Sequence, residues 1–453
     1  MILETKYFIL QLRSNMYSLI FRLLTVIIFI STAQTSYGQY LMDMLDTTKE
    51  LGRSNRDMLQ RFDHIRISGY MQPQFQATTS KGAHTYSGGD FAPQSDNRFM
   101  LRRGRIRFEY ARTNKENRSL LQFVFQFDGT EKGVNIRDFW GRVWENKFKT
   151  FAFTTGMFAR PFGFEINYSS TVRETPERGR MSQILMRSER DLGFMISAEA
   201  DKKETFINHF RLDAGLFNGQ GLTASGEFDS YKDLISQLVF KPSKLTDNLF
   251  ISGGVSILQG SIAQFADVNY VIGDKAGLVD FIADSSTKIG ARLPRHYRGA
   301  NVQLRYEHGW GNTELRGEYW KGTQTATRFN TETPGSVPTS PLNKYLPFYE
   351  RPFSGGFITL LQNIVNRKNQ IGIKYDWYDP NTKVAGLNIG DNNSFNEADI
   401  LYGTLGFGYI WYMTDNFKTT FWYEVVKNEK TSVPGYETDI SDDVFTLRLQ
   451  FTF

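Results

Sequence analysis

The feature that most constrains this chain is a strict alternation of apolar and polar residues along short segments. Its last nine residues, 445–453, read FTLRLQFTF, with large apolar side chains at every odd position and Arg448 and Gln450 among the polar ones. A period of two is that of a β-strand with one apolar and one polar face. Such a terminal strand requires an apolar medium on one side and a polar medium on the other. Lipid and a water-filled interior would supply both.

The same alternation recurs from residue 64 to the C-terminus and predicts about sixteen strands. The segment at 98–111, for example, sets Ile106 and Phe108 against arginines, whereas the segment near 135–145 has a weaker pattern. The expected strands are 64–76, 98–111, 120–128, 135–145, 150–158, 191–200, 206–217, 231–241, 248–258, 301–307, 313–320, 353–365, 370–377, 401–413, 418–425 and 445–453.

Connections between these strands alternate in length. Those after even-numbered strands are short, such as 309–310 and 366–367, and those after odd-numbered strands are mostly long, such as 159–190 and 259–296, with 129–134 as the exception. Short turns at one end and long loops at the other are typical of an outer-membrane β-barrel. We therefore expect an all-β transmembrane antiparallel barrel of about sixteen strands over 64–453, with short periplasmic turns and long extracellular loops.

The composition agrees with a strand-based membrane protein. Aromatic residues make up 15% of the chain, yet mean hydropathy is −0.40, and no stretch approaches the roughly 20 apolar residues that a spanning helix needs. Trp310, Trp377, Trp411 and Trp422 fit the aromatic belts at strand ends, although core packing would explain any one of them alone.

The N-terminus predicts export. Arg22 precedes the apolar run 23–30, and Ser36-Tyr37-Gly38 offers a small-x-small cleavage site, so residues 1–38 are interpreted as a Sec-type secretory signal peptide. Translation from Met16 instead of Met1 would leave this signal intact. Residues 39–63 would form a periplasmic segment, for which a short helix and a linker both remain open.

Several classes of function are not supported. There is no cysteine, which excludes disulfides and thiol catalysis. The five histidines lack metal-ligand spacing, no nucleophile elbow or P-loop occurs, and His209 is expected to be a plain inward-facing wall residue. We therefore expect no enzyme, cofactor or metal. Without the leader the net charge falls to about +3, too weak to indicate nucleic-acid binding.

Several stretches resemble the phosphate-selective porin O and P family of outer-membrane porins. They are FMLRRGRIRF (99–108), GMFARPFGFE (156–165, with Arg160 where a Lys is usual), SERDLGF (188–194), AGLFNGQG (214–221), LRGEYWKG (315–322) and IKYDWYDPNT (373–382). The resemblance runs from about residue 65 to the C-terminus. It implies a sixteen-stranded porin in the outer membrane of a Gram-negative-type bacterium, usually a homotrimer, with a constriction built by the third long loop folding inward near 159–190. The terminal Phe453 resembles the signal by which the outer-membrane assembly machinery recognises its clients.

Three arginines at spacing two form the sharpest candidate site. Arg103, Arg105 and Arg107 would all face the lumen, about 7 Å apart. Arginine suits anions because its planar fork matches phosphate oxygens and stays charged. These arginines would either form an anion-binding ladder or pair with carboxylates of neighbouring strands.

The third long loop supplies a second set of candidates. It carries Arg160, Arg173, Arg178, Arg180, Arg187 and Arg190 against four glutamates, Glu165, Glu174, Glu177 and Glu189. Folded into the barrel, it would form a positive constriction; left outside, its charges would pair locally. Arg211, Arg305 and Arg316 also face inward by parity, but so do several carboxylates.

We therefore expect a passive porin for small anions, with phosphate or polyphosphate as candidate solutes. The alternatives are a weakly selective porin for small polar solutes and a barrel that binds or adheres through its long loops.

Overall fold

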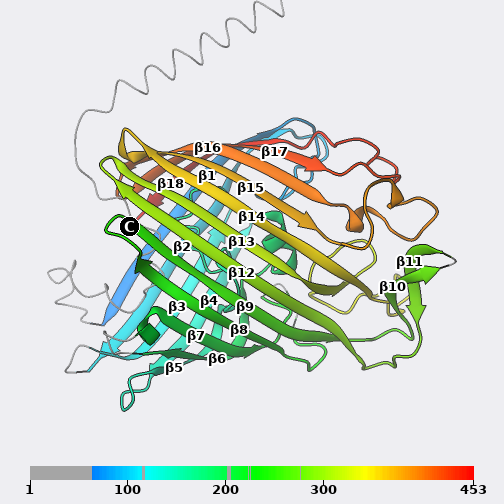
Figure 1. The fold of residues 1–453 in the computed structure, drawn as a ribbon, viewed down its shortest axis with the longest axis horizontal. Helices are drawn as coiled ribbons and strands as arrows, with labels where there is room; N and C mark the ends of the chain where they lie inside the picture. Colours follow the sequence, from blue (N-terminus) through cyan, green and yellow to red (C-terminus); the bar gives the residue numbers. More distant parts are fainter. Residues whose placement is uncertain (1–63, 115–117, 201–205, 223, 225, 276) are drawn as a thin grey trace, which may run out of the picture. The chain divides into compact units, whose positions relative to one another are not determined.

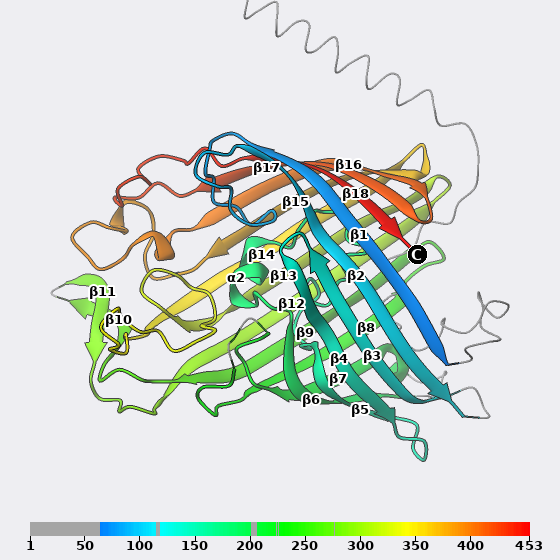
Figure 2. The same cartoon turned by 180° about the vertical axis from the view of Figure 1, so that it is seen from behind.

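The computed structural model describes residues 64–114, 118–200, 206–222, 224, 226–275 and 277–453. Its strands close into an antiparallel barrel of sixteen strands (Figures 1 and 2). The expected signal peptide and the expected periplasmic segment at 39–63 lie outside the described residues.

The barrel uses every strand except one separate hairpin, β10 (Asn269–Lys275) and β11 (Leu278–Asp284). The barrel strands are β1 (Ile65–Thr78), β2 (Asn97–Thr113), β3 (Ser119–Thr130), β4 (Gly133–Trp144), β5 (Phe151–Ala159), β6 (Arg190–Glu199), β7 (Phe210–Phe217), β8 (Asp233–Lys244), β9 (Leu249–Ala263), β12 (Arg292–His308), β13 (Gly311–Ala326), β14 (Tyr349–Ile364), β15 (Asn366–Asp379), β16 (Tyr402–Thr414), β17 (Phe417–Asn428) and β18 (Val444–Thr452). The helical elements are α2 (Arg180–Leu185), η2 (Phe206–His209), η3 (Gly386–Asn388) and η4 (Glu397–Asp399).

The C-terminal strand closes the barrel. β18 pairs with β1 from Thr78↔Val444 to Tyr70↔Thr452, and the backbones of Gly69 and Phe453 exchange two hydrogen bonds of 3.0 and 2.9 Å. A Cβ on Gly69 would lie 2.5 Å from the Phe453 ring, so glycine lets the terminal ring cover the seam. The expected terminal strand is therefore confirmed.

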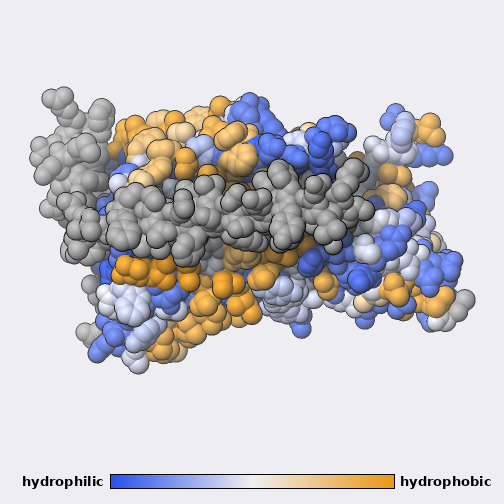
Figure 3. Space-filling view, turned by 90° about the horizontal axis from the view of Figure 1, so that it is seen from above, coloured by the Kyte–Doolittle hydropathy of each residue, from blue (hydrophilic) through white to orange (hydrophobic). Residues whose placement is uncertain are grey.

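The two faces of the strands separate as the alternation predicts. Ile67 is 56% exposed on the outside and Phe108 39%, whereas Gln72, Gln74 and Gln76 are buried inside. In Figure 3 apolar residues gather on the outer surface of the barrel, and polar residues gather toward the end with the long loops. An outward apolar band is the surface that a bilayer requires of a barrel.

All sixteen expected strands are present, and short and long connections lie at opposite ends (Figure 1). The described residues contain no helix that is long and apolar enough to cross a membrane, a finding that does not bear on spanning by strands.

The expected long loop at 259–296 is present and contains the β10–β11 hairpin, which pairs with β14 through a single bridge, Tyr270↔Tyr349. One expectation about a side chain was wrong. His209 ends the 3₁₀ turn η2 and is exposed rather than facing inward, because pairing of β7 with β8 begins only at Phe210. Trp422 is 1% exposed, so core packing and not a belt explains it; its indole occupies space left by Gly406 and Gly408, where a Cβ would clash with it.

The long connection between β5 and β6, residues 160–189, is named here the inner loop. It includes α2, which lies inside the ring of strands in both ribbon views (Figures 1 and 2). Its apolar side chains share one buried cluster with inward-facing residues of the wall. The loop members of this cluster are Phe162, Ile166, Met181, Ile184, Leu185 and Met186; the wall members include Met195, Ile235, Leu258, Tyr297, Trp320 and Phe353.

Candidate functional site

The inner loop is held against the wall by its four glutamates. Glu177 accepts from three wall arginines, Arg102 at 2.9 Å, Arg103 at 2.5 Å and Arg448 at 2.7 Å. The other three each have a wall cation: Glu165–Lys374 at 2.5 Å, Glu174–Arg316 at 2.8 Å and Glu189–Arg137 at 2.9 Å. We name the strands β2, β13, β15 and β18, which carry all of these contacts except that of Arg137, the docking wall.

The charge state of these glutamates follows from their neighbours. Burial alone raises the pKa of Glu177, but Arg102, Arg103 and Arg448 together hold that pKa well below its ordinary value. Glu189 behaves in the same way: burial raises its pKa, but Arg137, Arg178 and Arg190 together hold that pKa well below its ordinary value. Both side chains are therefore ionised at neutral pH and bind the wall as charge-assisted hydrogen-bonded pairs.

An apolar contact anchors the start of the inner loop. Phe162 is fully buried and packs edge-on against Trp320, with ring centroids 4.7 Å apart. Glu318 accepts the backbone N–H groups of Phe164 and Glu165 at 2.7 and 2.9 Å. Gly163 has φ +66°, and a Cβ there would lie 2.1 Å from a Glu318 oxygen. Only glycine fits at this close approach.

The three arginines at spacing two all face inward, and each has a carboxylate partner. Arg103 binds Glu177, Arg105 binds Asp128 at 2.8 Å, and Arg107 binds Glu109 at 3.1 Å. Arg105 also donates to Tyr70 and Ser170. Only Arg105 matches the paired alternative, because its partner lies on the neighbouring strand β3; Arg103 binds the inner loop and Arg107 pairs within its own strand.

The six arginines expected around the constriction, five in the inner loop and Arg190 at the start of β6, do not converge on one opening. Arg178 pairs with Glu189, Arg190 with Asp138 and the exposed Arg187 with Glu332. The other three have no carboxylate within ion-pair distance among the described residues: Arg160 donates to the carbonyls of Ser188 and Gly219, Arg173 to that of Tyr168, and Arg180 stacks on Tyr86 and Tyr402.

The remaining expected pore residues are also paired. Arg211 binds Asp213 at 2.9 Å, Arg305 binds Glu307 at 3.0 Å, and Arg316 binds both Glu174 and Glu314. A predicted inward orientation is thus correct for these side chains, but orientation alone does not make them available to a solute.

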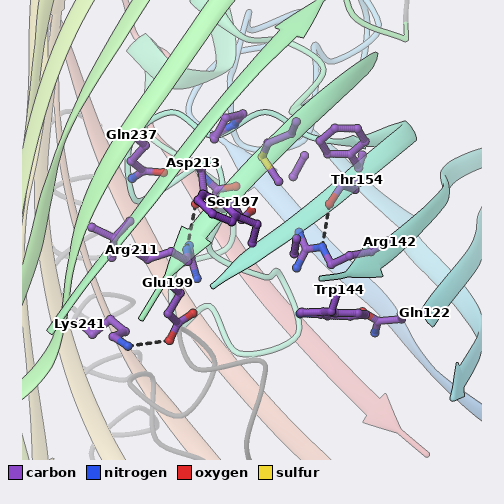
Figure 4. Close-up of a pocket in the computed structure, with 18 of the residues that line it drawn as sticks. Gln122, Arg142, Trp144, Thr154, Ser197, Glu199, Arg211, Asp213, Gln237 and Lys241 are labelled. Carbon is purple, nitrogen blue, oxygen red and sulfur yellow. Dashed lines mark hydrogen bonds and ion pairs between the residues drawn. The ribbon is translucent and has the colours of Figure 1, made fainter. Parts of the chain in front are cut away.

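A cavity of about 660 Å³ lies between the inner loop and strands β2–β9 and β12, and extends to the short turns (Figure 4). Its lining has seven basic and four acidic residues, which include Arg107, Arg190 and Arg211 of the expected set. Twelve further lining residues are Ser, Thr, Asn or Gln. We name its β4–β9 side the cavity wall.

The cavity wall contains a cation that the sequence analysis missed. Arg142 donates from Nε to Thr154 at 2.7 Å and has no carboxylate partner among the described residues. Its guanidinium lies 5.6 Å from the ring centroid of Trp140 and 5.7 Å from that of Trp144. All three residues line the cavity, at spacing two on β4. The period-two alternation that places Arg103, Arg105 and Arg107 on the inward face would also have placed Trp140, Arg142 and Trp144 there.

No protein-family model matches the sequence, and the comparison with curated proteins gives no match either. Solved structures do match. The outer membrane channel DcaP of Acinetobacter baumannii is 10% identical with a TM-score of 0.52, over 86% of this chain and 97% of that one. The fold is that of an outer-membrane porin barrel.

Two further porin-like structures align less closely. OmpT, an outer membrane protein of Vibrio cholerae in its trimer form, is 11% identical with a TM-score of 0.49, over 86% of this chain and 99% of that one. OmpF of Salmonella typhi, solved with daunomycin, is 10% identical with a TM-score of 0.47, over 86% and 97%. Only the DcaP alignment supports the fold, and at 10% identity it shows the fold alone, so the phosphate-selective family stays a prediction.

Proposed function

We propose that the protein is an outer-membrane channel for the passive diffusion of small anions. The observation that carries this proposal is a closed barrel with an apolar outer face and a polar inner cavity whose lining has more basic than acidic residues. Such a cavity concentrates anions because fixed charges act strongly in a confined, partly desolvated space.

The proposed selectivity is weak, and its source is the cavity wall. Most inward arginines are neutralised by a carboxylate, so only a small excess of positive charge faces the cavity. Phosphate and polyphosphate are candidate solutes because Arg142 presents a guanidinium without a carboxylate partner among the described residues.

The setting of this channel is also part of the proposal. We infer export by a Sec-type signal, insertion into the outer membrane of a Gram-negative-type bacterium and assembly as a homotrimer. The exposed Phe453, paired with Gly69 at the barrel seam, would be recognised by the outer-membrane assembly machinery.

A second candidate, a barrel that binds partners at the cell surface, rests on two observations. The apolar cluster of the inner loop occupies part of the lumen, and the β10–β11 hairpin carries exposed Leu278 and Val279 among the long loops. A fully plugged barrel would pass no current.

Planar-bilayer recording of the purified protein separates the two candidates. We expect open channels in potassium chloride, with reversal potentials in chloride and phosphate gradients that show a modest anion preference. Folded, inserted protein that passes no current would overturn the channel proposal and favour the surface-binding barrel. Open channels that prefer cations would overturn the anion preference alone.

A further inference from the structure

We propose that the cavity wall forms a saturable binding site for a sugar ring that carries a negative charge, such as a sugar acid or a sugar phosphate. This inference rests on the proposed function and names a solute class for the same cavity. It is carried by β4, where two tryptophans flank a guanidinium on the inward face.

The two tryptophans give the site a stacking surface. Trp140 and Trp144 are four residues apart on one face of β4, which places them roughly 13 Å apart along the strand. Both line the cavity and are only half-buried, although large aromatics of a barrel normally face lipid. Indole faces pack against the C–H faces of a pyranose ring, which is apolar above and below and polar around its edge.

Arg142 supplies the charge. It lies between the two indoles, and its Nε is fixed by Thr154. The terminal amino groups have no carboxylate partner among the described residues, whereas most of the other inward arginines have one. A guanidinium held in this way can bind a carboxylate or phosphate through two parallel hydrogen bonds.

The rest of the cavity suits hydroxyl groups. Gln122, Gln237, Asn301 and Gln303 line it, and an amide can donate to one hydroxyl and accept from another. Ser197 also lines the cavity, and its Oγ has no hydrogen-bond partner among the described residues, so part of the hydrogen-bonding capacity of this wall is unused.

The carboxylates across the cavity do not oppose an anion. Figure 4 shows Glu199 beside Lys241 and Asp213 beside Arg211, on the side away from Arg142. Their ion pairs measure 2.6 and 2.9 Å. An inorganic anion would need only the guanidinium, whereas the indoles and the amides together fit a ring with many hydroxyls.

The test compares three small solutes as blockers of the current through the full-length protein in planar bilayers. Glucuronate is a ring with a negative charge, glucose is a neutral ring, and gluconate is an open chain with the same charge as glucuronate. We expect glucuronate, added on the side of the short turns, to reduce the current in a saturable manner. Half-block should need at least about tenfold less glucuronate than glucose or gluconate, since each lacks one of the two interactions.

Variants assign the effect to residues. Arg142→Gln should abolish the preference for glucuronate over glucose, and Trp144→Ala should weaken block by both rings. The double variant Lys427→Gln/Asp439→Asn removes an exposed ion pair outside both the cavity lining and the inner loop without changing net charge, and should leave block unchanged. Equal block by gluconate and glucuronate, or unaltered block in Arg142→Gln, would overturn the site.

A second readout does not need an open channel. Tryptophan fluorescence of the folded protein in detergent should change saturably with glucuronate, and the change should be lost in the double variant Trp140→Phe/Trp144→Phe. Saturable fluorescence without any current would keep the binding site and reject the channel. Normal current in chloride with neither block nor a fluorescence change would keep the channel and reject the site.

Discussion

The docking wall and the cavity wall of the same barrel use inward-facing arginines in opposite ways. On the docking wall, Arg103 and Arg448 are buried against Glu177 of the inner loop. On the cavity wall, Arg142 lies between two indoles and has no carboxylate partner among the described residues. Both sets obey the same alternation along a strand. The difference teaches that the partner of an inward cation, and not its orientation, decides whether a solute can use it.

Glu177→Ala should produce the largest effect. It leaves three guanidiniums on the docking wall without their shared carboxylate, and breaking a buried ion pair in this way costs about 3–5 kcal/mol. We expect the inner loop to detach, so that trypsin cleaves it after Arg178 or Arg180 in folded protein, and single-channel conductance to rise.

The control for this change is Glu332→Gln, which removes the partner of the exposed Arg187 on the same loop. If both variants leave the inner loop equally resistant to trypsin, glutamate docking does not hold it.

Acid should loosen the docking wall but not the cavity wall. Burial raises the pKa of Glu177, but the neighbouring arginines together outweigh this effect and hold the pKa well below its ordinary value. A carboxyl whose pKa is lowered by folding contributes its full stabilisation at pH values above its unfolded pKa, about 4.3. This stabilisation is lost as the pH falls through the lowered pKa of the folded protein. We expect constant conductance from about pH 8 to about pH 5 and an increase only in stronger acid.

The same titration in Glu177→Gln isolates this group. The variant should lack most of the acid step. If the conductance of the native protein changes in a step centred between about pH 5 and about pH 7, and Glu177→Gln keeps this step, the acid response belongs to other groups.

Arg187→Gln should have the smallest effect. The Arg187 side chain is 62% exposed, and exposed ion pairs contribute at most about 1 kcal/mol. Thermal unfolding, followed by the heat-dependent shift in gel mobility, should be close to that of the native protein, and conductance should be unchanged. If Arg187→Gln lost as much stability as Glu177→Ala, the exposed and the buried ion pairs of the inner loop would contribute equally to stability.

Much of the barrel could be predicted because alternation and loop length are local properties. The strands, the inward orientation of Arg103, Arg105 and Arg107, and the seam at Phe453 all followed from residues close together in the sequence. The η2 turn that displaces His209 was missed because its apolar residues continue the strand pattern without any strand partner.

The site was less predictable because partners lie far apart in the chain. Glu177 is 74 residues from Arg103 and 271 from Arg448, and spacing within a strand carries no information about such pairs. Arg142 was missed for a different reason. A bulge in the pairing of β3 with β4, between Ile136 and Asp138, precedes the regular run 138–144, so the segment near 135–145 has a weaker pattern when it is taken as a whole.

The central claim is that anion preference arises at the cavity wall and not at the docking wall. Reversal potentials in a potassium chloride gradient test it most directly, when native protein is compared with Arg142→Gln and with Arg105→Gln/Asp128→Asn. The account predicts that Arg142→Gln lowers the anion preference, while the neutral double variant keeps it. Unchanged selectivity in Arg142→Gln, with a loss in the double variant, would contradict it and return selectivity to the row of arginines on β2.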